Sequence, residues 1–195
     1  MKQLLKAIVP LSLLLVSAVS AAADWQIDNA QSQLSFISIK KGDVAEVHRF
    51  GEIAGGLQQD GQFELSIALE SVNTGIQIRD SRMRSFLFKT AQFPQATLTA
   101  SLSPEFISNL TVGQSELTMV NAQLNLHDQS QPLKLDVRVT KVSDSSLLVI
   151  SAQPIVLNVA DYELTEGVEE LRELAGLPSI SQAVPVSFYL TLNAK

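Results

Sequence analysis

Apolar and polar residues alternate along much of the chain. The clearest run covers residues 62–69, where every second side chain is large and apolar. The same alternation returns over residues 133–140 and 184–192. Because successive side chains of a β-strand point to opposite faces of a sheet, this period of two indicates strands with one buried and one wet face.

Five further stretches have the composition of strands: 34–39, 45–53, 96–102, 117–126 and 147–157. Short polar turns separate several strand pairs, at residues 59–61, 127–130 and 143–146. Gly55 and Gly56 lack the lysine and the following helix of a phosphate-binding loop, and they predict a bulge or bend in a strand. Consecutive antiparallel strands joined by such turns predict a β-sandwich or an up-and-down barrel, and closure of a barrel would remove the edges that promote aggregation.

Two segments depart from the alternation. Over residues 76–88 apolar positions recur at helical spacing. A second helical stripe covers residues 164–175, and Gly176 and Pro178 end it. The chain is therefore expected to be mainly β, an antiparallel fold with one or two short helices.

Residues 1–23 have the features of a secretory signal peptide. Two lysines precede an apolar stretch over residues 7–16, and an Ala-x-Ala site follows at Ala21 and Ala23. The apolar core is shorter than the roughly 20 residues of a membrane-spanning helix. We expect cleavage after Ala23, export to the periplasm, and one mature domain at residues 24–195 with no stable membrane insertion.

Acidic residues outnumber basic ones, 20 to 14, and loss of Lys2 and Lys6 with the leader would move the net charge from −6 to −8. Nucleic-acid binding is disfavoured, because it depends on a basic face. The chain contains no cysteine, so the fold uses no disulfide and carries no lipidated cysteine. The roughly 170 residues that follow the leader suit one domain.

Residue types that support catalysis or metal binding are sparse. A nucleophile needs an adjacent base that a third group holds in place, and only two histidines, His48 and His127, are available. Glu46 with His48 and His127 with Asp128 are the candidate metal pairs, whereas a zinc site needs three or four clustered ligands. We therefore predict no catalytic residue and no metal site.

Four basic residues concentrate within eleven positions of this acidic chain: Arg79, Arg82, Arg84 and Lys89. One interpretation is a site for the anionic head group of an amphiphile, whose tail follows the neighbouring apolar side chains inward. The other is an amphipathic helix packed on the barrel, with solvated arginines and with Asp80 pairing one of them. We prefer the second for Arg84 and Lys89, and both stay open for Arg79 and Arg82.

Segments spread over nearly the whole mature chain carry a family resemblance: Trp25-Gln26-Ile27-Asp28, then Ser32, Leu34 and Phe36, Phe50 with Gly55 or Gly56, Ser71-Val72-Asn73-Thr74, Ile78-Arg79-Asp80, Met83, Phe86 to Phe88, Phe93-Pro94 and Leu124-Asn125-Leu126. Together they resemble the YceI-like family of periplasmic polyisoprenoid-binding proteins. The chain departs from the family pattern at Lys40-Lys41, where the family usually has a histidine, and at Ala122 and Asp128, where it has glycines.

The resemblance implies an extended antiparallel barrel of lipocalin type, closed by helical segments, that holds a polyisoprenoid, an isoprenoid quinone or a fatty-acyl lipid. A strand of nine residues at about 3.3 Å each spans roughly 30 Å, which suits a long ligand. Each buried methylene favours binding by about 0.8 kcal/mol, so an extended tail needs no dedicated polar site.

Eleven residues are candidates for contact with this apolar small-molecule ligand: Phe36, Phe50, Phe63, Leu65, Arg79, Asp80, Phe86, Phe88, Leu124, Leu126 and Phe188. No cofactor is expected other than the bound isoprenoid or lipid. The main alternative is a structural or stress-related interaction protein whose barrel is filled with side chains. An enzyme that uses His48 or His127 is a third hypothesis, and homodimer formation is left open.

Overall fold

The computed structural model describes residues 25–195, so the predicted signal peptide and its cleavage site lie outside the described residues. All strand pairings in this part are antiparallel. The strands are β1 (Trp25–Ile27), β2 (Gln33–Lys40), β3 (Val44–Phe50), β4 (Ile53–Leu57), β5 (Gln62–Ala68), β6 (Val72–Asn73), β7 (Gln95–Ser101), β8 (Ser115–Leu126), β9 (Gln129–Ser143), β10 (Ser146–Ser151), β11 (Ile155–Asn158) and β12 (Ala183–Ala194). The helices are α1 (Gln77–Arg82), α2 (Pro104–Asn109) and α3 (Thr165–Leu174), with shorter helical turns η1 (Asn29–Gln31), η2 (Leu69–Ser71), η3 (Met83–Leu87) and η4 (Val159–Tyr162).

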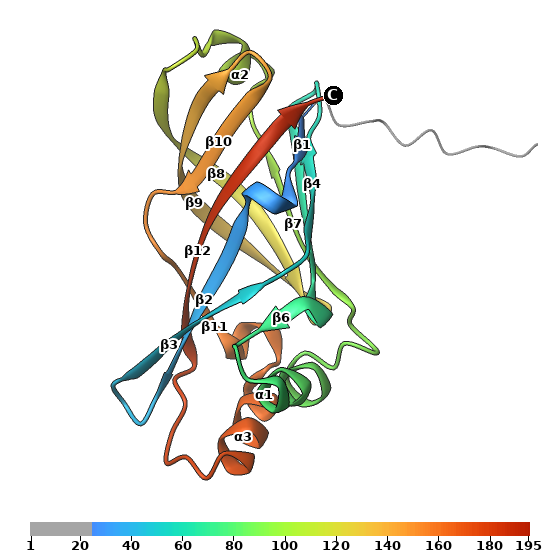
Figure 1. Ribbon diagram of the computed structural model, residues 1–195, viewed down its shortest axis with the longest axis vertical. Coiled ribbons are helices and arrows are strands. Elements are labelled where there is room, and N and C mark those ends of the chain that lie inside the picture. The colour runs from blue at the N-terminus through green and yellow to red at the C-terminus, as the bar shows by residue number, and fades with distance from the viewer. Residues whose placement is uncertain (1–24) are drawn as a thin grey trace, which may run out of the picture.

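Eight of these strands close into a barrel, in the order β1, β4, β5, β7, β8, β9, β10 and β12. The ring closes because β1 pairs with β4 on one side and with β12 on the other. The prediction of a mainly β, antiparallel barrel with short helices is confirmed. Figure 1 shows the helices α1 and α3 gathered at one end of this barrel.

The barrel has two halves, which differ in the strands that pair with the long strand β12. Residues 189–193 pair with β10 and residues 192–194 with β1, and we call this part the upper half. Residues 183–186 pair with β11 and residues 186–189 with β2, and this lower half adjoins the helices (Figure 1). The neighbours of β12 therefore change partway along it.

Two stretches predicted as continuous strands are interrupted. Residues 45–53 split into β3 and β4 at Gly51, and residues 147–157 split into β10 and β11 before Ile155. Pro154 lies in the second break, where proline has no N–H to donate to a ladder. These breaks allow the wall to change direction between the two halves.

The turn at His127 and Asp128 has a two-residue form. Both residues have positive φ, 56° and 59°, as a type I′ hairpin turn requires. Gly55 and Gly56 predicted a bulge or a bend, and the bulge is wrong, because β4 pairs with β5 in continuous register through both residues. Instead, Gly55 has φ of 130°, and a Cβ there would lie 2.0 Å from the carbonyl oxygen of Glu64.

The upper half of the barrel is filled with side chains. Val139, Leu147, Leu190 and Leu192 are at most 2% exposed and pack across its interior. Such density is typical of an ordinary protein core and leaves little free volume.

The helices α1, η3 and α3 close the lower half, and they form within 76–88 and 164–175, where the spacing predicted helices. Gly167 lets α3 approach η3 closely, since a Cβ at this position would lie 2.7 Å from the carbonyl oxygen of Phe86 and 2.8 Å from Cα of Leu87. This contact positions the apolar face of α3 toward the barrel.

Candidate functional site

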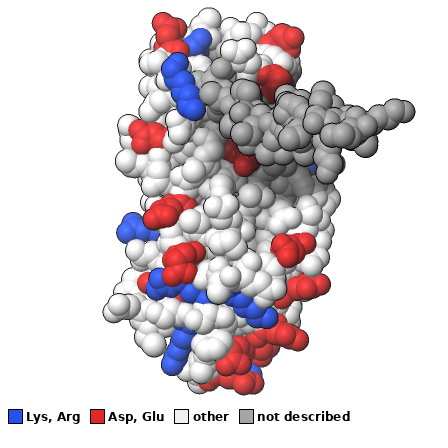
Figure 2. All heavy atoms as spheres, turned by 90° about the vertical axis from the view of Figure 1, so that its right-hand side faces the viewer, with Lys and Arg blue, Asp and Glu red and all other residues white. Residues whose placement is uncertain are grey.

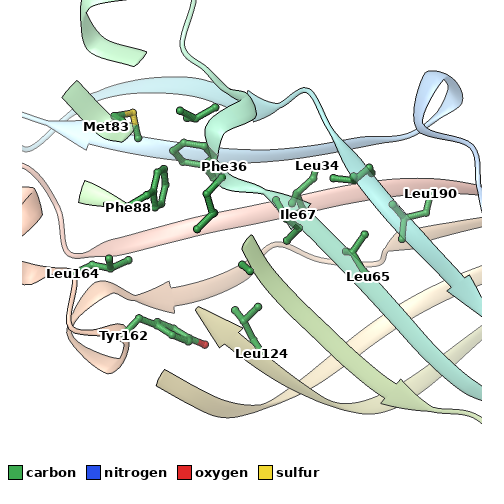
Figure 3. Close-up of a cluster of buried hydrophobic side chains, with 14 of the residues drawn as sticks. Leu34, Phe36, Leu65, Ile67, Met83, Phe88, Leu124, Tyr162, Leu164 and Leu190 are labelled. Carbon is green, nitrogen blue, oxygen red and sulfur yellow. The ribbon is translucent and has the colours of Figure 1, made fainter. Parts of the chain in front are cut away.

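A cavity of about 440 Å³ occupies the lower half of the barrel. Leu34, Phe36 and Leu124 line it from the strands, whereas Phe88 and Leu164 line it from the helical end (Figure 3). Most of its lining side chains are aliphatic or aromatic, and Lys40, Arg79 and Arg82 are the cations among them. A concave apolar space of this size is typical of a small-molecule site.

Aromatic contacts hold the helical end against the barrel wall. The rings of Phe36 and Phe50 lie 5.4 Å apart, and those of Phe50 and Phe88 lie 5.7 Å apart. Such tilted pairs contribute about 0.5–1.5 kcal/mol beyond their buried area. The segment that follows η3 is therefore a fixed part of the cavity wall.

The cavity reaches the surface beside α1. Ile76 and Ile78 line it, yet they are 48% and 61% exposed. Ile180 and Ser181, from the segment between α3 and β12, line the same region and are half-buried. An apolar molecule thus has an entrance between α1 and this segment.

Tyr162 brings a hydroxyl group into the apolar cavity. The residue is 2% exposed and lines the cavity, and Figure 3 shows its hydroxyl directed inward, toward Leu124. Burial raises the pKa of Tyr162 to about 12, so the phenol stays protonated and able to donate.

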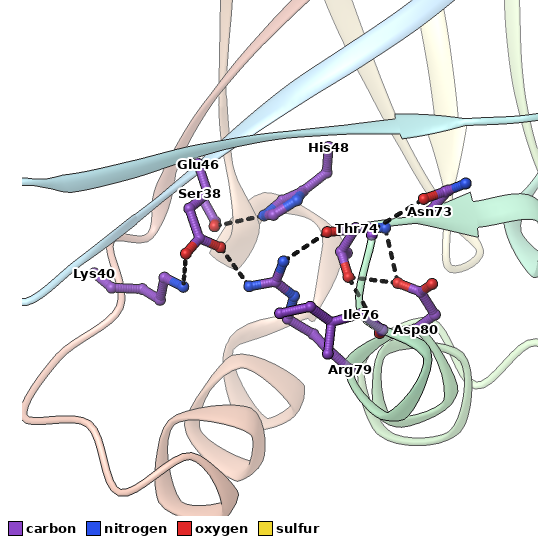
Figure 4. Close-up of polar contacts among 10 residues, drawn as sticks. Ser38, Lys40, Glu46, His48, Asn73, Thr74, Ile76, Arg79 and Asp80 are labelled. Atoms are coloured by element: carbon purple, nitrogen blue, oxygen red, sulfur yellow. Dashed lines mark hydrogen bonds and ion pairs between the residues drawn. The ribbon is translucent and has the colours of Figure 1, made fainter.

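Charged residues beside the entrance form a network that joins α1 to the β2–β3 hairpin (Figure 4). Glu46 accepts from Lys40 at 2.7 Å and from Arg79. Arg79 also donates to the carbonyl oxygen of Thr74 at 2.7 Å. Asp80 accepts from the backbone N–H of Thr74 at 2.8 Å and from its hydroxyl. The lysine's hydrogen bond is the main cause of the lowered pKa of Glu46.

Arg82 and Arg84, the other two arginines of the basic segment, also have partners. Arg82 donates to the carbonyl oxygen of Leu174 at 3.2 Å, which ties α1 to α3. Arg84 lies 3.3 Å from Glu70. Figure 2 shows acidic and basic side chains intermingled around the helical end of the face in view, so this part is not a uniformly basic surface.

His48 lies in the wall of the cavity, 3% exposed, with its Nε2 2.8 Å from the hydroxyl of Ser38. Its Nδ1 has no partner among the described residues. Burial, reinforced by the positive charge of Arg79, lowers the pKa of His48. The third group that would orient a catalytic base is thus absent from the described part of the chain.

His127 is buried under Phe93, with ring centroids 4.1 Å apart, and burial lowers its pKa. In the described range 25–195, no three His, Asp or Glu side chains gather as metal ligands would. Glu46, proposed as a partner of His48 in a metal pair, is instead engaged by Lys40 and Arg79. Over the same range no helix is both long and apolar enough to cross a bilayer.

Eight of the eleven candidate ligand contacts line the cavity: Phe36, Phe50, Leu65, Arg79, Phe88, Leu124, Leu126 and Phe188. Phe63 lines a smaller cavity of about 60 Å³ in the upper half. Asp80 bonds to Thr74 and stays outside the lining, and Phe86 is 40% exposed on η3. The structure therefore brings together most of the set but separates these three from it.

The cavity is also lined by residues that were not among the eleven candidates. Tyr162 comes from η4, whose position in the fold no local pattern indicates. Leu164, Val168 and Leu171 belong to the predicted stripe over 164–175, so their shared face was visible in the sequence. Which volume that face covers depends on the tertiary packing.

Comparisons with known proteins identify the architecture. The profile of the YceI-like domain matches residues 25–192. A solved polyisoprenoid-binding domain from Saccharophagus degradans, implicated in plant cell wall breakdown, has 38% sequence identity and a TM-score of 0.88, over 89% of this chain and 100% of that chain. No curated protein sequence matches the chain.

More distant structures share the fold alone. Burkholderia cenocepacia BcnA aligns with a TM-score of 0.66 at 16% identity, over 85% of this chain and 98% of that chain. The Campylobacter jejuni YCEI protein aligns with a TM-score of 0.55 at 14% identity, over 76% and 84% of the two chains. With its profile match over almost all described residues, the chain belongs to the YceI-like domain family.

Proposed function

We propose that this protein binds the apolar chain of a polyisoprenoid, an isoprenoid quinone or a fatty-acyl lipid in the lower cavity, and that it acts as a carrier in the periplasm. The observation that supports this most is the cavity of about 440 Å³ with its apolar walls and its entrance beside α1. The alternative, an interaction protein, requires a barrel that is filled from end to end. Only the upper half is filled in this way. The 38% identity to a polyisoprenoid-binding domain supports the same ligand class.

Burial of apolar surface supplies the affinity in this proposal. Each methylene that leaves water for the cavity favours binding by about 0.8 kcal/mol. Phe36, Phe88 and Leu124 offer the aliphatic and aromatic contacts for such a chain. The ligand needs no covalent chemistry, and none of the protein groups described above is arranged to supply it.

The Tyr162 hydroxyl gives the ligand one polar contact. It lies at the helical end of the cluster in Figure 3, whereas Leu65 and Leu190 lie farther along the barrel. A ligand whose tail points into the barrel would place its head-group oxygen near this end. The protonated phenol then donates to that oxygen, and such a hydrogen bond contributes about 0.5–1.5 kcal/mol.

Arg79 and Asp80 act as anchors of α1 in this proposal rather than as head-group ligands. The guanidinium of Arg79 is already engaged by Glu46 and by the carbonyl oxygen of Thr74. Asp80 already accepts from Thr74. A head group that recruited Asp80 or the terminal nitrogens of Arg79 would have to break these contacts first, whereas the buried Nε of Arg79 has no partner among the described residues.

The test is native mass spectrometry of the protein purified from its own host, followed by titration with prenyl and acyl probes. Ala96 lines the cavity and is 3% exposed, so Ala96→Phe should fill part of it and reduce binding. Ala54 lies on β4, is exposed and stays outside the lining, so Ala54→Phe is the matched control.

We expect a bound lipid or uptake of a probe by the native protein and by Ala54→Phe, with weaker uptake by Ala96→Phe. Circular dichroism checks that both variants are folded. A native protein that carries no ligand and takes up no probe would refute the proposed function and favour the interaction protein. Fractionation of host cells tests the periplasmic location separately.

A further inference from the structure

Three side chains divide the interior of the barrel into two unequal spaces. Leu65, Leu98 and Phe188 line both the cavity of about 440 Å³ in the lower half and the cavity of about 60 Å³ in the upper half. We call these three residues the floor. Each space therefore ends at the same layer of side chains.

The floor spans the barrel because its members come from opposite walls. Leu65 on β5 and Leu98 on β7 are direct cross-strand partners. In the closed ring β12, which carries Phe188, lies on the far side from β5 and β7. The N–H of Phe188 donates to the hydroxyl of Ser151 at 3.1 Å, and the residue pairs with Leu34, so its place on the wall is fixed.

Beyond the floor the interior offers almost no room. Leu190 and Leu192, the next inward residues of β12, are 2% and 1% exposed. A chain that entered from the helical end would meet Phe188 and then this packed core. It could advance only by displacing side chains that are already close-packed.

We infer that the floor sets the length of apolar chain that the protein accommodates, an inference that rests on the proposed binding function. A water molecule occupies about 30 Å³ of liquid, so 440 Å³ holds about 15 groups of that size. With one carbon group in each such volume, this number corresponds to roughly three isoprene units of five carbons each. Additional units of a longer chain remain outside the entrance and stay in contact with water.

The experiment compares the affinities of geraniol, farnesol and geranylgeraniol, which contain two, three and four isoprene units. Each buried methylene favours binding by a factor of about four, so a buried unit should raise affinity at least about tenfold. The native protein should gain this factor from geraniol to farnesol. From farnesol to geranylgeraniol the gain should be about threefold or less.

Phe188→Ala removes the ring from the floor and joins the two cavities. In this variant geranylgeraniol should bind at least about tenfold more tightly than farnesol, because the fourth unit is now buried. Leu98→Ala opens the floor from the opposite wall and should shift the preference in the same direction. It also keeps the inference testable if Phe188→Ala fails to fold.

Phe63→Ala is the matched control, because Phe63 lines the upper cavity but not the lower one. Its length preference should equal that of the native protein. A native affinity that rises another tenfold at the fourth unit, or folded floor variants that keep the native preference, would overturn the inference while leaving the binding function intact. If none of the three alcohols binds but an acyl probe does, this inference alone is overturned. If the native protein carries no lipid and takes up no prenyl or acyl probe, the proposed function fails, and this inference fails with it.

Discussion

The close approach of α3 to η3 makes Gly167 the most sensitive position of the helical end. In Gly167→Ala the new methyl group would lie 2.7 Å from the carbonyl oxygen of Phe86 and 2.8 Å from Cα of Leu87. Both neighbouring atoms belong to the backbone, so no side chain can simply rotate away. The helix α3 must shift outward instead.

Two effects of opposite sign determine the result. Alanine favours a helix interior over glycine by about 1 kcal/mol. Overpacking of a well-packed contact costs about 1–3 kcal/mol, and here the contact is with rigid backbone, so we take the upper part of that range. The free energy of unfolding should therefore fall by about 1–2 kcal/mol. For a protein of this size the corresponding decrease in Tm is roughly 2–8 °C.

The assay is thermal and urea unfolding of the native protein and the variant, with Gly51→Ala as the control. The Cβ of that control would lie 3.5 Å from the nearest atom, an ordinary van der Waals distance. Gly51→Ala should thus leave Tm within about 2 °C of the native value. A Gly167→Ala variant as stable as the native protein would refute the reasoning, because it would mean that α3 and η3 are not in the tight contact described.

Three further outcomes follow from the site. Tyr162→Phe should weaken the binding of farnesol about 3- to 10-fold and leave that of the hydrocarbon farnesene unchanged, since a hydrogen bond contributes about 0.5–1.5 kcal/mol; equal losses for both in calorimetric titrations would count against the proposed contact. Arg79→Ala frees α1 from Glu46 and should increase hydrogen exchange of the α1 amides, whereas unchanged exchange would show that this ion pair does not hold the helix. Burial lowers the pKa of His48 and His127 from 6.5, so the unfolded state binds more protons, and the stability present above that value should be lost as the pH falls toward 5. Thermal unfolding between pH 7.5 and 5 tests this, with a smaller loss for His48→Gln and a contradiction if stability rises.

The period-two pattern predicted the barrel well because it is a local property of each strand. Residues 62–69 became β5, and residues 133–140 lie within β9, each with one face inward. Two helical segments were equally visible, since the spacing over 76–88 and 164–175 is also local. The short helix α2 was missed, because six residues give too few turns for a helical period to stand out.

The cavity itself was beyond local reasoning. Alternation indicates that Phe63 and Leu65 point inward, but it does not show at which height each one faces a void. The position of Tyr162 depends on where η4 returns to the barrel wall, and that return is a tertiary event. The partners of Arg79 could not be predicted either, since Glu46 is distant in sequence and meets it only when the hairpin folds over α1.

The change of neighbours along β12 has a consequence for motion. Its upper residues are held within a packed core, whereas its lower residues border a hollow that the helices cover. Fluctuations that open the lower end need not disturb the upper one, because local opening is easiest where few side chains are packed together. A bound ligand could then leave through local opening of the helical end while the upper half of the barrel keeps its structure.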